Sequence, residues 1–149
     1  MAHLNIRKME ITDLEEVQEV EVLSFTNPWP KEILHQELVD NQYAHYFVIE
    51  LAGQIIGYVG LWIVLDDAQI TNIAISPAYR GNRYGEKLFA YACQQAQWQG
   101  VKRLSLEVRA SNTVAQRMYR KFGLVPGGVR KNYYTDNHED AIVMWVNLQ

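Results

Sequence analysis

The acidic side chain of Glu107 stands out because it lies within an otherwise apolar segment, RLSLEVR. Successive side chains of a strand point to opposite faces, so Glu107 faces away from Leu106 and Val108. Burying a carboxylate is costly unless it is paired or useful. Two interpretations stay open: an ion pair with an arginine, or a general base that takes a proton from an amine, directly or through water. An α-amine has a pKa of about 8 and is mostly protonated at neutral pH, so a base could accelerate its reaction by about 10²- to 10⁴-fold.

A basic turn, AYRGNRYGEKL, follows an apolar segment and precedes an amphipathic one. Unpaired amides and the positive end of a helix, together with Arg80 and Arg83, are suited to a phosphate. The alternative is that both arginines are solvated and that Gly81 and Gly85 serve only the turn. Neither a Walker pattern nor GxGxxG after a strand is present, which disfavours nucleotide hydrolases and dinucleotide-binding proteins.

The segment NTVAQRMYRKFG contains two further candidates. Tyr119 is three residues from Phe122 and four from Ala115, so it could simply be a core residue of a helix. Its phenol, with a pKa of about 10, could instead protonate a departing thiolate and return to its neutral form at pH 7. Asn112 is placed to cap the same helix.

The elements that must position these residues follow from hydrophobic periodicity and turn residues. We predict antiparallel strands in the first half and strand–helix units in the second, which together favour a mixed α/β domain on one central sheet. A capping box of Thr12 and Glu15 predicts the start of the first helix. The remaining predicted elements are a short helix from Pro30, strands in HYFVIEL, IIGYVGLWIVL and AQITNIAIS, a helix over 84–99, a strand in KRLSLEVR, a helix ended by Gly123, and strands in LVPGGVRKNYY and EDAIVMWVNL.

Composition limits the class of protein. The 149 residues fit one domain, 1–149, and 48% hydrophobic with 21% charged residues is typical of a folded chain. A net charge of −3 gives no general attraction to nucleic acid or to an anionic membrane. Cys93 is the only cysteine, and the four histidines are scattered, so we predict no disulfide and no metal site. No signal peptide or membrane-length apolar run is present, so we expect a cytoplasmic protein.

The segment NIAISPAYRGNRYGEKL resembles the acetyl-CoA motif of the GNAT acetyltransferase family, in which an Arg or Gln and two small residues surround the pyrophosphate. Arg80 and Gly85 match that motif, whereas Arg83 stands where the family usually has its first glycine. The segments FTNPWP, LEVRASN and RKNYYTDNHEDAIVMW extend the resemblance over nearly the whole chain. Within the family, the chain is similar to bacterial enzymes that acetylate the N-terminal alanine of a ribosomal protein.

The resemblance implies a mostly antiparallel sheet with a splayed pair of strands at the cofactor site, and acetyl-CoA as co-substrate without a metal. It implies that Glu107 is the general base and Tyr119 the general acid. In similar enzymes, tyrosines before the last strand hold the first residues of the substrate, here Tyr133 and Tyr134. The implied cofactor contacts are Ile73, Ala74 and Ile75 through their backbone, the turn residues Arg80, Gly81, Asn82, Arg83, Tyr84, Gly85 and Glu86, and Asn112.

We therefore expect an acetyl-CoA-dependent N-α-acetyltransferase that transfers the acetyl group directly within a ternary complex. The expected substrate is a protein N-terminus, the N-terminal alanine of a small-subunit ribosomal protein. A basic substrate terminus would be attracted by acidic residues such as Glu21, Asp66 and Asp67. Two alternatives remain: an acetyltransferase of small-molecule amines on the same fold, and a CoA-binding module without catalysis.

Overall fold

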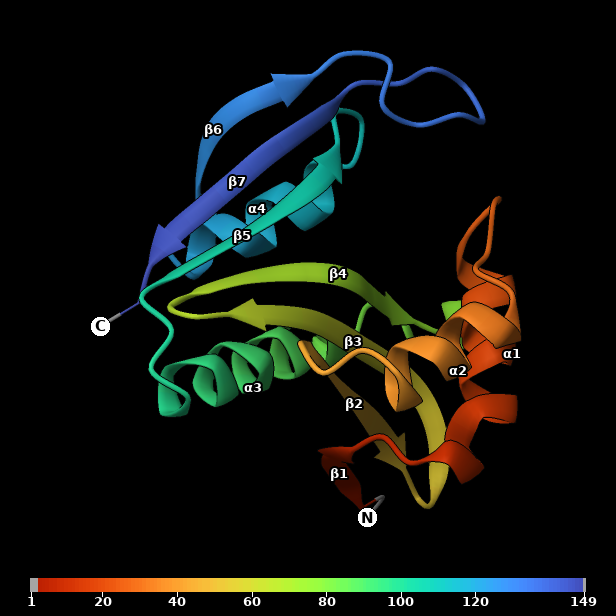
Figure 1. The fold of residues 1–149 in the computed structure, drawn as a ribbon. Helices are drawn as coiled ribbons and strands as arrows, with labels where there is room; N and C mark the ends of the chain where they lie inside the picture. The colour runs from red at the N-terminus through yellow and green to blue at the C-terminus, as the bar shows by residue number, and fades with distance from the viewer. Residues whose placement is uncertain (1–2, 149) are drawn as a thin grey trace.

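The computed structural model describes residues 3–148. These residues form seven strands and four α-helices, and short 3-10 turns at Ile11–Asp13 and Pro77–Tyr79 precede α1 and α3 (Figure 1). The elements are β1 Leu4–Lys8, α1 Leu14–Ser24, α2 Lys31–Val39, β2 Ala44–Leu51, β3 Gln54–Val64, β4 Asp67–Ile75, α3 Tyr84–Trp98, β5 Arg103–Arg109, α4 Thr113–Lys121, β6 Val125–Arg130 and β7 Ala141–Asn147.

One sheet contains all seven strands in the order β1-β2-β3-β4-β5-β7-β6. Every neighbouring pair is antiparallel except β4 and β5, which run parallel and pair only at residues 67–69 with residues 103–105. Beyond that point the two strands separate, as Figure 1 shows. The register of β3 and β4 also shifts between Gly60 and Leu61, so Thr71 has no partner on β3. The predicted mixed, mostly antiparallel sheet with a splayed pair is confirmed.

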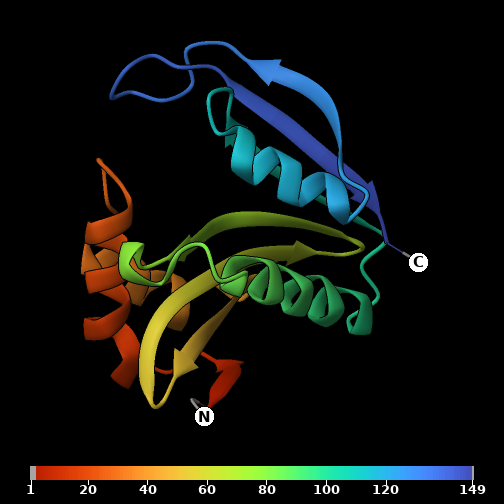
Figure 2. The same cartoon turned by 180° about the vertical axis from the view of Figure 1, so that it is seen from behind.

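The helices cover both faces of this sheet. Leu88, Phe89 and Ala92 of α3 pack with Leu106 of β5 and Tyr119 of α4 in the larger core cluster. The apolar side of α1 packs with α2 against the opposite face, in a second cluster with Tyr58 of β3. Figure 2 shows α3 below and α4 above the opening between β4 and β5. The two halves of the sheet thus each carry their own helix beside the opening.

The start of the chain differs from the sequence-based prediction. Residues 4–8 form an additional strand, β1, which pairs with β2 and which the sequence analysis missed. The capping box was also wrongly placed: Asp13, not Glu15, accepts a hydrogen bond from the backbone N–H of the residue three positions earlier, Glu10, at 2.7 Å. A 3-10 turn at Ile11–Asp13 delays the first α-helical residue to Leu14.

Among the described residues there is neither a membrane-length apolar helix nor a cluster of metal-ligating side chains. Between residues 3 and 148, no helix combines the length and apolar composition that a membrane crossing needs. Over the same residues, no three or more His, Cys, Asp or Glu side chains are grouped so that they could hold a metal ion.

Candidate functional site

Two cavities meet where β4 and β5 separate. The first, the Glu107 cavity, has a volume of about 480 Å³ and extends from β5 to the loop after α1. The second, the Arg80 cavity, has a volume of about 670 Å³ and lies between the start of α3 and α4. Four residues line both: Phe25, Ile73, Asn112 and Tyr119. The two cavities therefore share these four residues as a common wall.

The turn before α3 forms one wall of the Arg80 cavity. Gly81 and Arg83 both adopt left-handed backbone angles, with φ of 84° and 63°, and Arg83 is the N-cap of α3. Glycine adopts this conformation readily, whereas it costs another residue about 1–2 kcal/mol. The arginine at this position therefore keeps a conformation that glycine would favour, and it adds a positive charge to the cavity wall.

The cavity brings together most of the residues predicted to contact a cofactor. The exception is Asn82, whose side-chain amide donates to the carbonyls of Tyr79 and Arg80 at 3.2 and 3.3 Å and so stabilises the turn itself. The predicted residues that line the Arg80 cavity are Ile73, Ala74, Ile75, Arg80, Gly81, Arg83, Tyr84, Gly85, Glu86 and Asn112.

Two contacts hold the walls of this cavity. The Nε of Arg80 donates to the backbone carbonyl of Ile75 at 2.9 Å, which ties the turn to the end of β4. Across the cavity, Lys121 of α4 lies 3.5 Å from the carboxylate of Glu86 on α3. The carbonyl of Ile75, one of the backbone groups expected to contact a cofactor, thus already accepts a hydrogen bond from Arg80.

Glu107 projects from β5 into the first cavity, as the alternation of its strand predicts, because Leu104, Leu106 and Val108 are all buried on the other face. Its Oε1 accepts a hydrogen bond from Gln69 at 3.2 Å and lies 3.5 Å from the Nε of Arg130. Its Oε2 accepts from the hydroxyl of Tyr133 at 3.1 Å. The ion pair with an arginine and a position on the wall of a cavity therefore occur together, at a side chain that is only 14% exposed.

The two tyrosines before β7 lie beside this carboxylate. Tyr133 is 45% exposed, and burial of its phenol and the neighbouring Glu107 both raise its pKa, so it remains a hydrogen-bond donor at neutral pH. Tyr134 packs edge-on against it at 5.1 Å, with the guanidinium of Arg109 3.9 Å from its ring centre. Burial raises the pKa of Tyr134 to about 12, although that guanidinium opposes the rise. Tyr133 is thus the more exposed of the pair, whereas Tyr134 is partly buried.

Tyr119 and Asn112 occupy the junction of the two cavities. Tyr119 is only 5% exposed and its ring packs 5.0 Å from that of Phe89, so the core interpretation is correct as far as its ring is concerned. Burial is the main cause that raises the pKa of its phenol above the ordinary value. The side chain of Asn112 accepts from the backbone N–H of Ala115 at 3.1 Å, which confirms the predicted helix cap.

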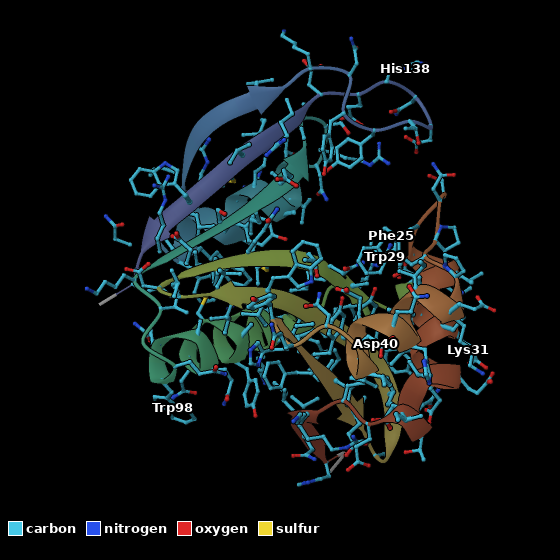
Figure 3. All side chains as sticks on the ribbon, in the orientation of Figure 1. Phe25, Trp29, Lys31, Asp40, Trp98 and His138 are labelled. Atoms are coloured by element: carbon cyan, nitrogen blue, oxygen red, sulfur yellow. The ribbon has the colours of Figure 1, made fainter. Side chains whose placement is uncertain are left out.

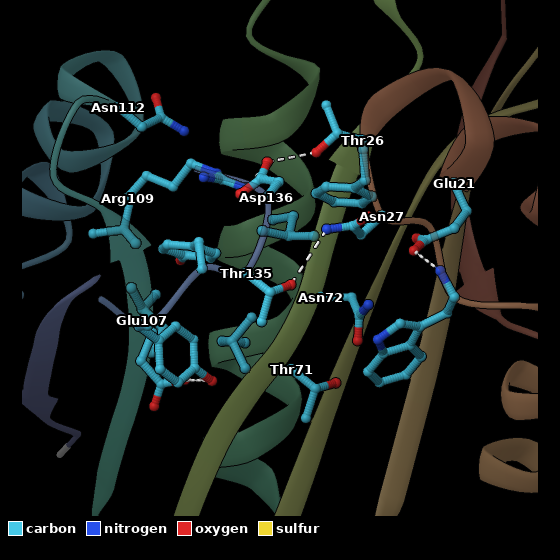
Figure 4. Close-up of a pocket in the computed structure, with 18 of the residues that line it drawn as sticks. Glu21, Thr26, Asn27, Thr71, Asn72, Glu107, Arg109, Asn112, Thr135 and Asp136 are labelled. Carbon is cyan, nitrogen blue, oxygen red and sulfur yellow. Dashed lines mark hydrogen bonds and ion pairs between the residues drawn. The ribbon is translucent and has the colours of Figure 1, made fainter. Parts of the chain in front are cut away.

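The outer wall of the Glu107 cavity comes from the loop after α1, whose residues the sequence analysis did not assign to the site, and from the residues that follow Tyr133 and Tyr134. Thr26, after α1, donates to Asp136 at 2.6 Å, and Asn27 donates to Thr135 at 3.5 Å (Figure 4). The guanidinium of Arg109 donates to the carboxylate of Asp136 at 2.9 Å. Phe25 and Trp29 of the first loop lie together next to α1, on the side toward β4 (Figure 3). The segment FTNPWP is the only sequence feature that pointed to this loop.

The three acidic residues considered as attractors have different positions. Glu21 lines the Glu107 cavity but is 1% exposed. Asp66 and Asp67 lie at the turn between β3 and β4, where the backbone carbonyl of Asp66 accepts from Lys102 and Arg103. That turn is at the end of the sheet where β4 and β5 still pair, and neither aspartate lines the Glu107 cavity or the Arg80 cavity.

The known proteins that this chain is similar to are acetyltransferases. The model of the Acetyltransferase (GNAT) family matches residues 14–124. A Bacillus subtilis protein with the provisional name ribosomal protein bS18-alanine N-acetyltransferase is 56% identical over 143 residues, covering 96% of this chain and 95% of that protein. The Escherichia coli ribosomal protein bS18-alanine N-acetyltransferase is 34% identical, covering 93% and 94%. The crystal structure of the ribosomal-protein-S18-alanine N-acetyltransferase from Escherichia coli superimposes with a TM-score of 0.92 over 99% of this chain and 95% of the other, at 30% identity.

Proposed function

The chain belongs to the GNAT acetyltransferase family, and we propose that it acetylates the α-amine of a protein N-terminus with acetyl-CoA, most specifically the N-terminal alanine of a small-subunit ribosomal protein. The observation that carries the proposal is the meeting of the two cavities. Glu107 is in one, a basic turn is in the other, and Tyr119 lies at the junction. We expect the reaction in the cytoplasm, where ribosomal proteins are synthesised.

The Arg80 cavity suits acetyl-CoA by its chemistry. Arg80 and Arg83 supply positive charge at the amino end of α3, where unpaired backbone amides and the helix dipole favour a diphosphate. Residues 73–75 of β4 pair only with β3, because β5 has already separated from β4. Apart from the Ile75 carbonyl, which accepts from Arg80, the backbone groups on that side of the strand are therefore available to the amides of a pantetheine arm. Such an arm would lead the thioester from the turn toward Tyr119.

In the proposed mechanism, Glu107 takes a proton from the acceptor α-ammonium, directly or through water. The free amine then attacks the thioester carbonyl. A backbone N–H within residues 73–75 would stabilise the oxyanion that forms on that carbonyl. When the intermediate collapses, the C–S bond breaks and Tyr119 donates its phenolic proton to the thiolate. The acetylated nitrogen loses its remaining extra proton, which returns to the Tyr119 phenolate through water, and Glu107 releases the proton it took to solvent. The raised pKa of Tyr119 keeps the phenolic proton in place at neutral pH, as a donor requires, although it also makes the proton harder to release.

The Glu107 cavity is the proposed site of the acceptor. Tyr133 and Tyr134 on one side and the loop containing Thr26 on the other would hold its first residues. Tyr133 already donates a hydrogen bond to Glu107, so an arriving amine would have to share or replace this contact. The relatives named as alanine N-acetyltransferases support a protein terminus over a small amine.

The experiment compares acceptors at equal acetyl-CoA concentration. We expect kcat/KM for a short peptide that begins with alanine to exceed, by at least about 100-fold, that for a polyamine and for an α-N-blocked peptide with an internal lysine. Equal or higher kcat/KM for the polyamine would identify the small-molecule alternative. Binding of acetyl-CoA without transfer to any of the three acceptors would favour the non-catalytic alternative.

A further inference from the structure

Glu21 is a buried carboxylate that the proposed chemistry does not use. It lies on α1, on the side of the Glu107 cavity opposite β5, and it is 1% exposed (Figure 4). The hydroxyl of Tyr58 on β3 donates to its Oε1, and the backbone N–H of Trp29 donates to its Oε2 at 2.7 Å. Neither partner carries a charge. A buried carboxylate without a cation is costly to keep, which suggests a role beyond packing.

The contacts of Glu21 bracket the loop after α1. Its backbone carbonyl accepts from the N–H of Phe25 at 3.1 Å, and its side chain accepts from the N–H of Trp29. The loop of residues 25–30 is therefore fixed at both ends by one residue, which Tyr58 in turn connects to the sheet. Between these ends, Phe25, Thr26 and Asn27 all line the Glu107 cavity.

The same loop reaches across the cavity. Thr26 and Asn27 bond to Asp136 and Thr135, which follow Tyr133 and Tyr134 in the chain. If the loop of residues 25–30 moved away from Glu21, one wall of the Glu107 cavity would therefore move, and the hydrogen bonds of Thr26 and Asn27 to the opposite wall would break. In contrast, Oε1 of Glu107 is held by Gln69 of β4 and Arg130 of β6, and only Tyr133, at Oε2, belongs to the opposite wall.

We propose that Glu21 is a positioning residue for the acceptor: by accepting from the backbone N–H of Trp29 it fixes the loop of residues 25–30 that forms the acceptor wall of the Glu107 cavity. This inference rests on the proposed function, because it assigns the acceptor to that cavity. Glu21 acts by hydrogen bonding and not by attracting a positively charged terminus, since both of its oxygens are occupied and its side chain is covered.

Two substitutions separate hydrogen bonding from charge. In Glu21→Gln, the amide oxygen can accept from the Trp29 N–H while the amide nitrogen donates to the Tyr58 oxygen, so both links persist without the charge. In Glu21→Leu, a side chain of similar size makes neither link and leaves the Trp29 N–H unpaired. The acceptor KM should rise about tenfold or more in Glu21→Leu and stay within about twofold in Glu21→Gln. In both variants the Kd of acetyl-CoA should stay within about twofold, which also shows that the protein is folded.

Tyr58→Phe is the matched control, because it removes the bond to Oε1 and keeps the bond to Trp29. We expect its acceptor KM to remain within about threefold of wild type even where its melting temperature falls. If KM instead follows melting temperature across all three variants, the role of Glu21 is merely structural and the proposal is overturned. An equal rise of KM in Glu21→Gln and Glu21→Leu would overturn it in favour of charge attraction.

Hydrogen–deuterium exchange supplies a readout that does not need activity. Exchange at residues 25–30 should be faster in Glu21→Leu than in wild type and unchanged in Glu21→Gln; unchanged exchange in Glu21→Leu would contradict the proposal. If Glu21→Leu does not fold, Glu21→Gln alone decides, since a tenfold rise in its KM refutes the inference and a retained KM supports it. A wild-type protein that acetylates no peptide refutes the proposed function, whereas the exchange experiment still tests the loop.

Discussion

The substitution Glu107→Gln removes the proposed base while keeping the shape of its side chain. The amide oxygen can accept from Gln69 at the present position of Oε1, and the amide nitrogen can donate to the oxygen of Tyr133. Only the weak ion pair with Arg130 is lost, at an Nε–Oε1 distance of 3.5 Å and with the arginine side chain 58% exposed. Such a pair contributes less than about 1 kcal/mol, so the free energy of unfolding should change little.

The expected effect on rate is much larger. Loss of general-base help lowers kcat by about 10²- to 10⁴-fold, which corresponds to about 3–5 kcal/mol of barrier. The reaction of the variant should then depend on acceptor that is already deprotonated. With an α-amine pKa of about 8, that fraction rises about tenfold between pH 7 and pH 9. The variant rate should rise by about the same factor over this range.

The assay is the initial rate of thiol release from acetyl-CoA with an alanine-starting peptide, at pH 7 and pH 9, together with calorimetric titration of acetyl-CoA. The Kd of acetyl-CoA should stay within about twofold of wild type, because Glu107 does not line the Arg80 cavity. Asp67→Asn, which removes a carboxylate at the distant β3–β4 turn, is the control for loss of charge and should retain wild-type rates. Full activity of Glu107→Gln at neutral pH would show that the assignment of the base is wrong.

Substitutions at Arg83, Tyr119 and Asp13 test three other features: a left-handed backbone angle, the proposed acid and an ion pair near the start of the chain. Arg83→Gly should relieve about 1–2 kcal/mol of strain from the left-handed backbone, partly offset by about 0.5–1 kcal/mol of added chain entropy in the unfolded state. The same substitution should weaken acetyl-CoA binding, and an unchanged Kd in calorimetry would show that the Arg83 guanidinium does not contribute to that binding. Tyr119→Phe should lower kcat by about 100-fold with an unchanged Kd for acetyl-CoA, and wild-type kcat in steady-state assays would exclude it as the acid. The hydrogen bond from Arg7 is the main cause that lowers the pKa of Asp13 in the folded protein. This pair therefore stabilises the fold above the unfolded pKa of about 3.9, and the stabilisation is lost as pH falls through the lower folded pKa. In urea unfolding, the free energy of unfolding should fall less between pH 5 and pH 3 in Asp13→Asn than in wild type.

Local sequence patterns were sufficient for the elements that present the candidate catalytic residues. Alternation in β5 placed Glu107 opposite the buried leucines, and the position of Asn112 before an amphipathic segment predicted the helix cap. In contrast, the separation of β4 from β5 has no signature in either strand, because both have the apolar alternation of ordinary paired strands. That feature came from the family resemblance and not from the residues.

Contacts between distant segments account for most of what was missed. Thr26 and Asp136 are separated by 110 positions, and no local pattern relates them. Glu21 was considered as an attractor of a basic terminus. It lies seven residues after Leu14, on the apolar side of α1, so helical periodicity could have predicted its burial. The additional strand β1 also has a local signal that was overlooked, the alternation of Leu4 and Ile6 with polar residues.

The central claim is that this chain acetylates the α-amine of a protein N-terminus. The most direct measurement is mass spectrometry of an alanine-starting peptide incubated with acetyl-CoA and the protein, with fragmentation to locate the modification and Glu107→Gln as the parallel reaction. The account predicts a gain of one acetyl group on the α-amine with the wild-type protein and a strongly reduced gain with the variant at pH 7. No acetyl group on the α-amine across several N-terminal sequences, or an acetyl group only on lysine side chains, would contradict it.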